Sequence, residues 1–160
     1  MSKKVAIILS GCGVFDGAEI NETVLTALRL DQQGAQVEFF APDITQHHVL
    51  NHLTGEEMPE QRNVLVESAR MTRGQSRDVR ELQAADFDAL IMPGGFGVAK
   101  NLSDFAFKGA DCTVQADTLQ AILQFKEAKK PIGLMCISPV LSAKIFGEGV
   151  QCTIGSDQDT

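Results

Sequence analysis

The first forty residues alternate between short apolar runs and a segment of helical periodicity. The runs 5–9 and 37–41 are mostly apolar, which is typical of strands buried on both faces of a parallel sheet. Between them, apolar residues recur at helical spacing from Ile20 to Leu28, and Gly34 is placed to end that helix. The order strand, helix, strand predicts a crossover unit, with which a parallel sheet begins.

The rest of the chain continues this alternation. The ranges that predict helices are 62–73, 114–129 and 139–146, and those that predict strands are 87–92, 132–135 and 150–154. Residues 44–59 show no period and are expected to form a long surface loop, and 75–80 a linker. Without a repeat or a domain boundary, residues 1–160 are expected to form one α/β domain. Its predicted architecture is a three-layer sandwich with helices on both faces of a mostly parallel central sheet.

Composition narrows the expected partners. The 160 residues carry a formal charge of -7 and include three His, no Trp and no Tyr, which is poor equipment for binding nucleic acid. No apolar run reaches the roughly 18 residues of a membrane span, so no membrane partner is expected. The first residues lead directly into a predicted strand, so no secretory leader is expected. The four cysteines are scattered, so they are expected to be reduced thiols in a cytoplasmic protein.

Reactive side chains are expected in the loops after the strands, because ligand sites of open α/β sheets form beyond the carboxyl ends of the strands. Cys136 follows a strand at a sharp turn into a helix, where backbone N–H groups stabilise a thiolate, and is the best candidate nucleophile. Glu19, after the first strand, is placed to donate a hydrogen bond to the thiolate or to carry a proton. The N–H groups around Gly94, Gly95 and Ile137 are candidates to hold an oxyanion.

Each of these residues also has a purely structural interpretation. A single cysteine after a buried strand is more often a small core residue than a nucleophile. An acidic residue such as Glu19 in a first helical turn commonly favours the positive end of the helix. Gly94 and Gly95 are equally suited to a turn with positive φ.

Cofactor sites find little support in the sequence. His47, His48 and His52 lie close together but not at metal-ligand spacing with a cysteine pair, so no metal is expected. His52 is kept as an accessory residue for the thiol. The run Gly11-Cys12-Gly13 lacks the third glycine of a dinucleotide-binding loop, and there is no P-loop lysine, so nucleotide binding is not expected.

Four segments, taken in order, carry a resemblance to a known family. They are 10–20, 51–56, 93–102 and 135–139, with the sequences SGCGVFDGAEI, NHLTGE, PGGFGVAKNL and MCISP. Together they are similar to the enhancing-lycopene-biosynthesis family, the isoprenoid-biosynthesis glyoxalases of the ThiJ/PfpI superfamily. The resemblance implies a fold like that of class I glutamine amidotransferases.

The resemblance also implies an activity. Members look like glyoxalases of the third kind, cofactor-free lyases that convert small 2-oxoaldehydes such as glyoxal to hydroxy acids such as glycolate without glutathione. Protein deglycase activity and a homodimer are further implications, as are more strands and a closing helix beyond Thr160. The family nucleophile corresponds to Cys136 and its glutamate to Glu19. Many superfamily members have His directly after the cysteine, where this chain has Ile137, so an amidotransferase or peptidase triad is not expected.

Two hypotheses use the same thiolate. In the first, Cys136 adds to an aldehyde to form a hemithioacetal, Glu19 moves a proton between the two carbons, and water releases the hydroxy acid. In the second, the protein is a non-enzymatic binding or redox-sensing protein whose Cys136 is oxidised to a sulfinic acid. The residues alone do not separate them.

Overall fold

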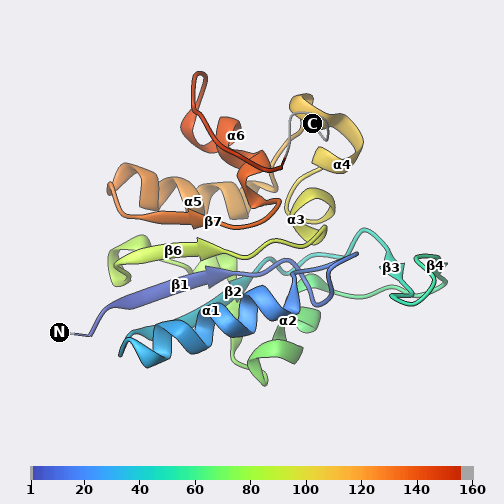
Figure 1. Ribbon diagram of the computed structural model, residues 1–160, viewed down its shortest axis with the longest axis horizontal. Coiled ribbons are helices and arrows are strands. Elements are labelled where there is room, and N and C mark those ends of the chain that lie inside the picture. The colour runs from blue at the N-terminus through green and yellow to red at the C-terminus, as the bar shows by residue number, and fades with distance from the viewer. Residues whose placement is uncertain (1, 156–160) are drawn as a thin grey trace.

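A parallel sheet of five strands forms the centre of the computed structural model, which describes residues 2–155 (Figure 1). In chain order its strands are β1 (Lys4–Ile8), β2 (Gln36–Ala41), β5 (Ser76–Asp78), β6 (Ala89–Met92) and β7 (Ile132–Leu134). They lie side by side in the order β5-β2-β1-β6-β7, and each neighbouring pair is parallel. The chain therefore winds outward from β1 to one edge and then from β6 to the other. Such a reversal between β1 and β6 is where open α/β sheets bind ligands.

Helices cover both faces of this sheet. On one side lie α1 (Ile20–Gln32) and α2 (Val64–Thr72), and on the other α5 (Ala116–Glu127) and α6 (Ser142–Phe146) (Figure 1). The short helices α3 (Gly97–Lys100) and α4 (Phe105–Lys108) follow β6. Single 3-10 turns lie at Val79–Glu81, Ala84–Asp86, Gly109–Asp111 and Ser138–Leu141. The arrangement confirms the predicted three-layer α/β sandwich.

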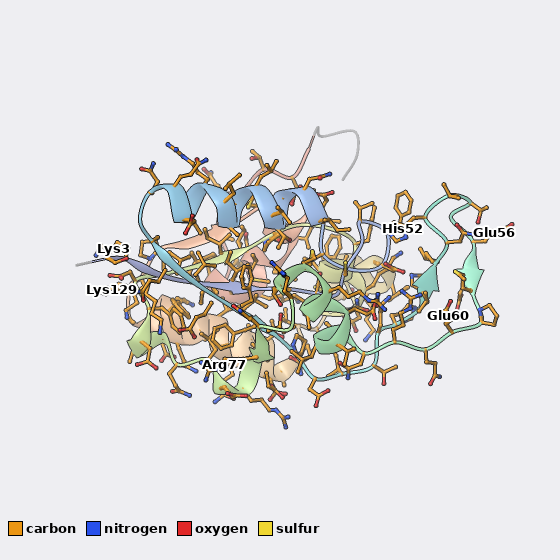
Figure 2. All side chains as sticks on the ribbon, turned by 90° about the horizontal axis from the view of Figure 1, so that it is seen from below. Lys3, His52, Glu56, Glu60, Arg77 and Lys129 are labelled. Carbon is orange, nitrogen blue, oxygen red and sulfur yellow. The ribbon has the colours of Figure 1, made fainter. Side chains whose placement is uncertain are left out.

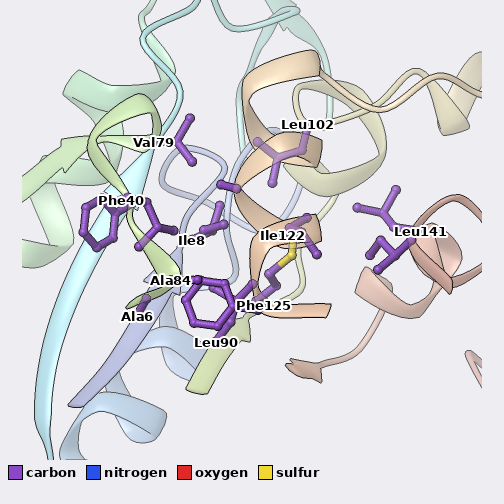
Figure 3. Close-up of a cluster of buried hydrophobic side chains, with 14 of the residues drawn as sticks. Ala6, Ile8, Phe40, Val79, Ala84, Leu90, Leu102, Ile122, Phe125 and Leu141 are labelled. Carbon is purple, nitrogen blue, oxygen red and sulfur yellow. The ribbon is translucent and has the colours of Figure 1, made fainter. Parts of the chain in front are cut away.

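Two apolar cores hold the layers together. Alternate residues of β1 enter different cores: Ile8 joins the cluster beneath α5, and Ile7 the cluster beneath α1 and α2. In the larger cluster, Ile122 and Phe125 of α5 are fully buried close to Ile8 (Figure 3). Because both faces of β1 are covered, its residues from Val5 to Ile8 are all apolar.

Three segments differ from the prediction. Residues 44–59 contain an antiparallel hairpin, β3 (Val49–Leu50) with β4 (Glu57–Met58), whose strands are too short to show a period. The predicted linker 75–80 contains β5, a polar edge strand paired only with β2, and edge strands commonly carry charge. Residues 150–154 form no strand, because they have no strand partner in the part of the chain that is described. Within residues 2–155, no helix is long and apolar enough to cross a bilayer.

Candidate active site

Cys136 occupies a strained turn directly after β7. Its φ of 55° lies in the left-handed region, which a residue with a side chain adopts at an energetic cost. Ser138 stabilises the turn with two hydrogen bonds. Its N–H donates to the Met135 carbonyl oxygen at 2.8 Å, and its buried hydroxyl donates to the Pro93 carbonyl oxygen at 2.8 Å. The turn holds Cys136 exposed at the carboxyl edge of the sheet, as expected for a nucleophile.

Gly94 lets a carboxyl group approach the Cys136 thiol. A Cβ atom at Gly94 would lie 2.4 Å from Cys136 Cβ, and 2.9 Å from both Cys136 Sγ and Glu22 Oε2. The missing side chain therefore leaves space in which thiol and carboxyl face each other. The Gly94 N–H donates to Glu22 Oε2 at 2.7 Å, which fixes the carboxyl at this position.

Glu22 and the backbone act on the Cys136 thiol in opposite directions. Burial of the sulfur raises the pKa of Cys136, and the Glu22 charge and a hydrogen bond to the Glu22 side chain raise it further. The nearby N–H groups of Gly95 and Ile137 lower the pKa, but their effect is smaller. The charge of Glu22 therefore favours the neutral Cys136 thiol.

The structure gives Glu19 a different place from the predicted one. Glu19 is the N-cap of α1, and its Oε2 accepts the Glu22 N–H at 2.6 Å. The cap satisfies a backbone donor that the first helical turn leaves free. Glu22 lies one turn further along α1 and reaches Gly94 and Cys136. Sequence reasoning missed Glu22 and gave its position to Glu19.

The three predicted oxyanion donors, the N–H groups of Gly94, Gly95 and Ile137, do not all have the same role. The Gly95 and Ile137 N–H groups lower the pKa of the Cys136 thiol, whereas the Gly94 N–H is bonded to Glu22. An oxygen on a carbon bound to that sulfur would lie near the Gly95 and Ile137 donors, because a covalent bond keeps it close to Sγ. Gly94 therefore orients the carboxyl, and the other two remain candidates for the oxyanion.

A cavity of about 270 Å³ opens beside the thiol. Its lining residues are Val14, Gly95, Phe96, Cys136, Ile137 and Ile154. Ligand pockets are commonly apolar with a few polar groups that orient the ligand. This cavity has that character, and it accommodates a small carbonyl compound against Cys136.

His52 lies on the β3–β4 hairpin, which projects from the body of the protein (Figure 2). Its Nε2 accepts the Phe15 N–H at 3.3 Å, its Nδ1 lies 3.1 Å from the Leu50 carbonyl oxygen, and its ring packs on Phe15 with centroids 4.9 Å apart. These contacts tie the hairpin to the loop after β1. They do not bring His52 to Cys136, so the structure gives no support to an accessory role in thiol chemistry.

The other cysteines do not line this cavity, and a raised pKa does not distinguish them from Cys136. Burial raises the pKa of both Cys12 and Cys112, which favours the neutral thiol. Cys152 is exposed, and its thiol lies 3.6 Å from the Pro139 carbonyl oxygen. Among the residues that the structure describes, no group of three His, Cys, Asp or Glu side chains is arranged to hold a metal ion.

The loops after β1 and β6 are joined by hydrogen bonds at the edge of the sheet where the winding reverses. The Glu19 N–H donates to the Gly94 carbonyl oxygen at 2.9 Å, and the Gly97 N–H donates to the Gly17 carbonyl oxygen at 2.9 Å. The buried Asn101 side chain adds two hydrogen bonds, to the carbonyl oxygens of Ser10 and Asp16, each at 2.9 Å. This packing fixes the start of α1, and with it Glu22, relative to the loop that contacts Cys136.

Gly97→Ala is expected to destabilise the protein by about 1–3 kcal/mol through overpacking. Its Cβ would lie 2.5 Å from the Ser10 carbonyl oxygen and 2.6 Å from Gly17 Cα, both of which are backbone atoms in a buried position. Gly133→Ala is the matched control, because the nearest atom to its Cβ is Ile91 Cγ1 at 3.4 Å. Urea unfolding of both variants measures the difference, and equal midpoints would show that the loops adapt.

The fold and the site define an amidotransferase-like α/β protein with a cysteine at the turn after a strand, and similarity to known proteins agrees. No family model matches the chain. A crystal structure of an isoprenoid biosynthesis protein with an amidotransferase-like domain from Ehrlichia chaffeensis superposes with a TM-score of 0.86 at 40% identity, covering 92% of this chain and 70% of that one. A ThiJ/PfpI domain protein from Brachyspira murdochii shares the fold, with a TM-score of 0.52 at 14% identity over 89% of this chain and 62% of that one.

Two mammalian proteins are closer in sequence. The rat ES1 protein homolog, mitochondrial, is 51% identical over 157 residues, which cover 98% of this chain and 59% of that protein. The human glutamine amidotransferase-like class 1 domain-containing protein 3, mitochondrial, is 50% identical over 157 residues, which cover 98% and 58%. The chain belongs to the amidotransferase-like family of the Ehrlichia chaffeensis protein. It spans somewhat more than half the length of these mammalian relatives.

The names of the mammalian relatives correct one prediction. Both are described as mitochondrial, so the predicted cytoplasmic location is wrong. That prediction depended on scattered cysteines and on the absence of a secretory leader. Reduced thiols indicate a reducing compartment, and they do not say which one.

Proposed function

We propose that the protein is a glutathione-independent glyoxalase that converts small 2-oxoaldehydes such as glyoxal to hydroxy acids such as glycolate. The observation that supports this most is the pairing of the Cys136 thiol with the Glu22 carboxyl beside a cavity of about 270 Å³. The reaction needs a nucleophile and a group that transfers a proton over a short distance, and this pair supplies both.

The reaction is an internal redox exchange followed by hydrolysis. The Cys136 sulfur adds to one aldehyde carbon of glyoxal, and the carbonyl oxygen takes up a proton to give a hemithioacetal. Glu22 removes the hydrogen of that carbon as a proton and returns a proton to the neighbouring carbon through an enediol, which leaves a thioester. Water then hydrolyses the thioester to glycolate and free thiol. Glyoxal plus water gives glycolic acid, so no external oxidant or reductant is needed.

The residues at the cavity suit the charges that develop. Negative charge lies on the oxygen next to the sulfur when the thiolate adds to the aldehyde and again when the enediol collapses to the thioester, and the Gly95 and Ile137 N–H groups are available there. The carboxyl of Glu22 is held by the Gly94 N–H, so it stays within reach of both carbons of a substrate bound to Cys136. Glu22 thus takes the proton-transfer role that the sequence analysis gave to Glu19.

The test is to follow ¹³C-labelled glyoxal by NMR with the purified, reduced protein. Glycolate is expected to form catalytically, in many equivalents per protein, and without added glutathione. Circular dichroism and the intact mass establish that the sample is folded and that Cys136 is unoxidised. The absence of glycolate above the protein-free rate in such a sample would refute the proposed function.

The proposal extends to a homodimer and to a role in isoprenoid metabolism. Support for the dimer comes from exposed apolar side chains along α1, which are Ile20, Val24, Leu25 and Leu28. Contiguous apolar surface of this kind often marks an interface between proteins. Support for the metabolic role is the name of the Ehrlichia chaffeensis protein.

A further inference from the structure

A second cavity, of about 170 Å³, lies next to the cavity at Cys136. Its lining residues are Phe15, Leu50, Gly55, Phe96 and Lys100. Phe96 lines both cavities and so lies between them. A ligand longer than glyoxal, bound at Cys136, would therefore extend past Phe96 toward Lys100.

Lys100 presents a charged group to this second cavity. Its Nζ donates to the Phe15 carbonyl oxygen at 3.0 Å and lies 3.1 Å from His48 Nε2 and 5.2 Å from the centroid of the Phe96 ring. An ammonium group has three N–H donors, so these two hydrogen bonds leave one for a ligand. Within residues 2–155, no carboxylate oxygen lies within ion-pair distance of Lys100.

The surroundings of Lys100 favour an anionic ligand. Burial lowers the pKa of Lys100, because desolvation disfavours the ammonium form. Burial also lowers the pKa of His48, and the nearby Lys100 charge lowers it further, so His48 is the neutral hydrogen-bond acceptor of the pair. The closest acidic influence, the buried Asp16, has its Oδ2 bonded to the Leu50 N–H at 2.7 Å. A carboxylate bound next to Lys100 would offset the desolvation cost with a charge-assisted hydrogen bond.

We propose that this second cavity, here called the Lys100 subsite, binds the carboxylate of an extended 2-oxoaldehyde whose aldehyde end reaches Cys136. The apolar walls of Phe15, Leu50 and Phe96 accept the methylene groups between the two ends. The inference deepens the proposed function and depends on it for the identity of the aldehyde end. The part that is independent of the proposed function is that Lys100 selects a ligand with a carboxylate.

Kinetics with two matched substrates test the selection. 4,5-Dioxopentanoate carries a carboxylate opposite its 2-oxoaldehyde group, and 2-oxopentanal is its neutral analogue of equal carbon number. Lys100→Met is expected to lower kcat/KM for 4,5-dioxopentanoate by about tenfold or more, the effect of losing one charge-assisted hydrogen bond, and to change it less than about twofold for 2-oxopentanal. Lys126→Met is the control for net charge, because Lys126 is exposed on α5 and lines neither cavity. An equal loss for both substrates would overturn the proposal.

A binding experiment tests the subsite without turnover. The Cys136→Ser protein is titrated with 4-oxopentanoate, which has the carboxylate but no aldehyde, and with neutral 2-pentanone, while ¹⁵N amide shifts are recorded. The amides of Phe15, Phe96 and Lys100 are expected to respond to 4-oxopentanoate, with a Kd about tenfold higher when Lys100→Met is added. Equal binding of the two compounds would refute the Lys100 subsite. If binding depends on Lys100 but the wild-type protein turns over no aldehyde, the Lys100 subsite is supported and the glyoxalase function is refuted.

Discussion

Cys136→Ala is expected to abolish glycolate formation from glyoxal, with kcat/KM reduced by about a thousandfold or more, because no covalent intermediate can form. The structure gives the substitution little other consequence. The side chain is exposed, and alanine removes only a sulfur that packs against Gly94. Loss of the strain at φ 55° is not involved, because alanine keeps the Cβ that makes this conformation costly. The rate of glycolate formation by NMR, with folding checked by circular dichroism, measures the effect.

Cys152→Ser is the matched control, because Cys152 is the other exposed cysteine among the described residues and does not line the cavity. It is expected to retain wild-type turnover. Retention of more than about a tenth of the activity by Cys136→Ala would contradict the covalent mechanism. An inert wild-type protein whose Cys136 gains two oxygen atoms under mild peroxide, seen by mass spectrometry, would favour the redox-sensing alternative.

The sequence was sufficient to predict those strands that are buried on both faces of the sheet. The run from Val5 to Leu9 is apolar because both faces of β1 are covered, and the pattern needs no information from distant residues. The edge strand β5, Ser76–Asp78, lacks such a signal, since it pairs only with β2 and its polar side chains are half-buried or exposed. Its strand conformation results from the neighbouring strand, which a local pattern does not reveal.

The position of Cys136 was also accessible, because topology brings the ends of parallel strands to one edge of the sheet. Cys136 follows β7 and Gly94 follows β6, so their proximity is a consequence of strand order. The prediction placed the carboxyl of Glu19 beside Cys136, whereas the structure places that of Glu22 there. No sequence signal separated them, because the capping box places Ser or Thr at the N-cap, whereas Glu19 caps α1 by accepting the Glu22 N–H.

Lys100 and His52 illustrate what local patterns leave out. Both lie against the loop after β1, but His52 reaches it from a hairpin with strands of two residues, and Lys100 from the end of a four-residue helix. Segments this short carry no periodicity from which their orientation can be predicted. Their contacts depend on the packing of the whole edge of the sheet where the winding reverses.

Glu22→Gln is expected to reduce glyoxal turnover by about a hundredfold or more, the usual contribution of a proton-transfer group, whereas Glu19→Gln stays within a few fold of wild type. Glutamine at position 22 keeps an oxygen that accepts the Gly94 N–H, but it cannot carry the proton between the two carbons. Glutamine at position 19 still caps α1, since its amide oxygen accepts the Glu22 N–H. Rates of glycolate formation for the two variants therefore distinguish the carboxyl that reacts from the carboxyl that caps.

The pKa of Cys136 in Glu22→Gln separates proton transfer from simple activation of the thiol. After burial, the Glu22 charge and its hydrogen bond raise this pKa, while the Gly95 and Ile137 N–H groups lower it. Removal of the charge is therefore expected to lower the pKa, so that thiolate forms at lower pH, as measured by its ultraviolet absorbance. The variant would hold more thiolate than wild type and still turn over more slowly, which a role in thiol activation cannot explain. A raised pKa in Glu22→Gln would instead mean that protonated Glu22 donates to the thiolate in the wild-type protein.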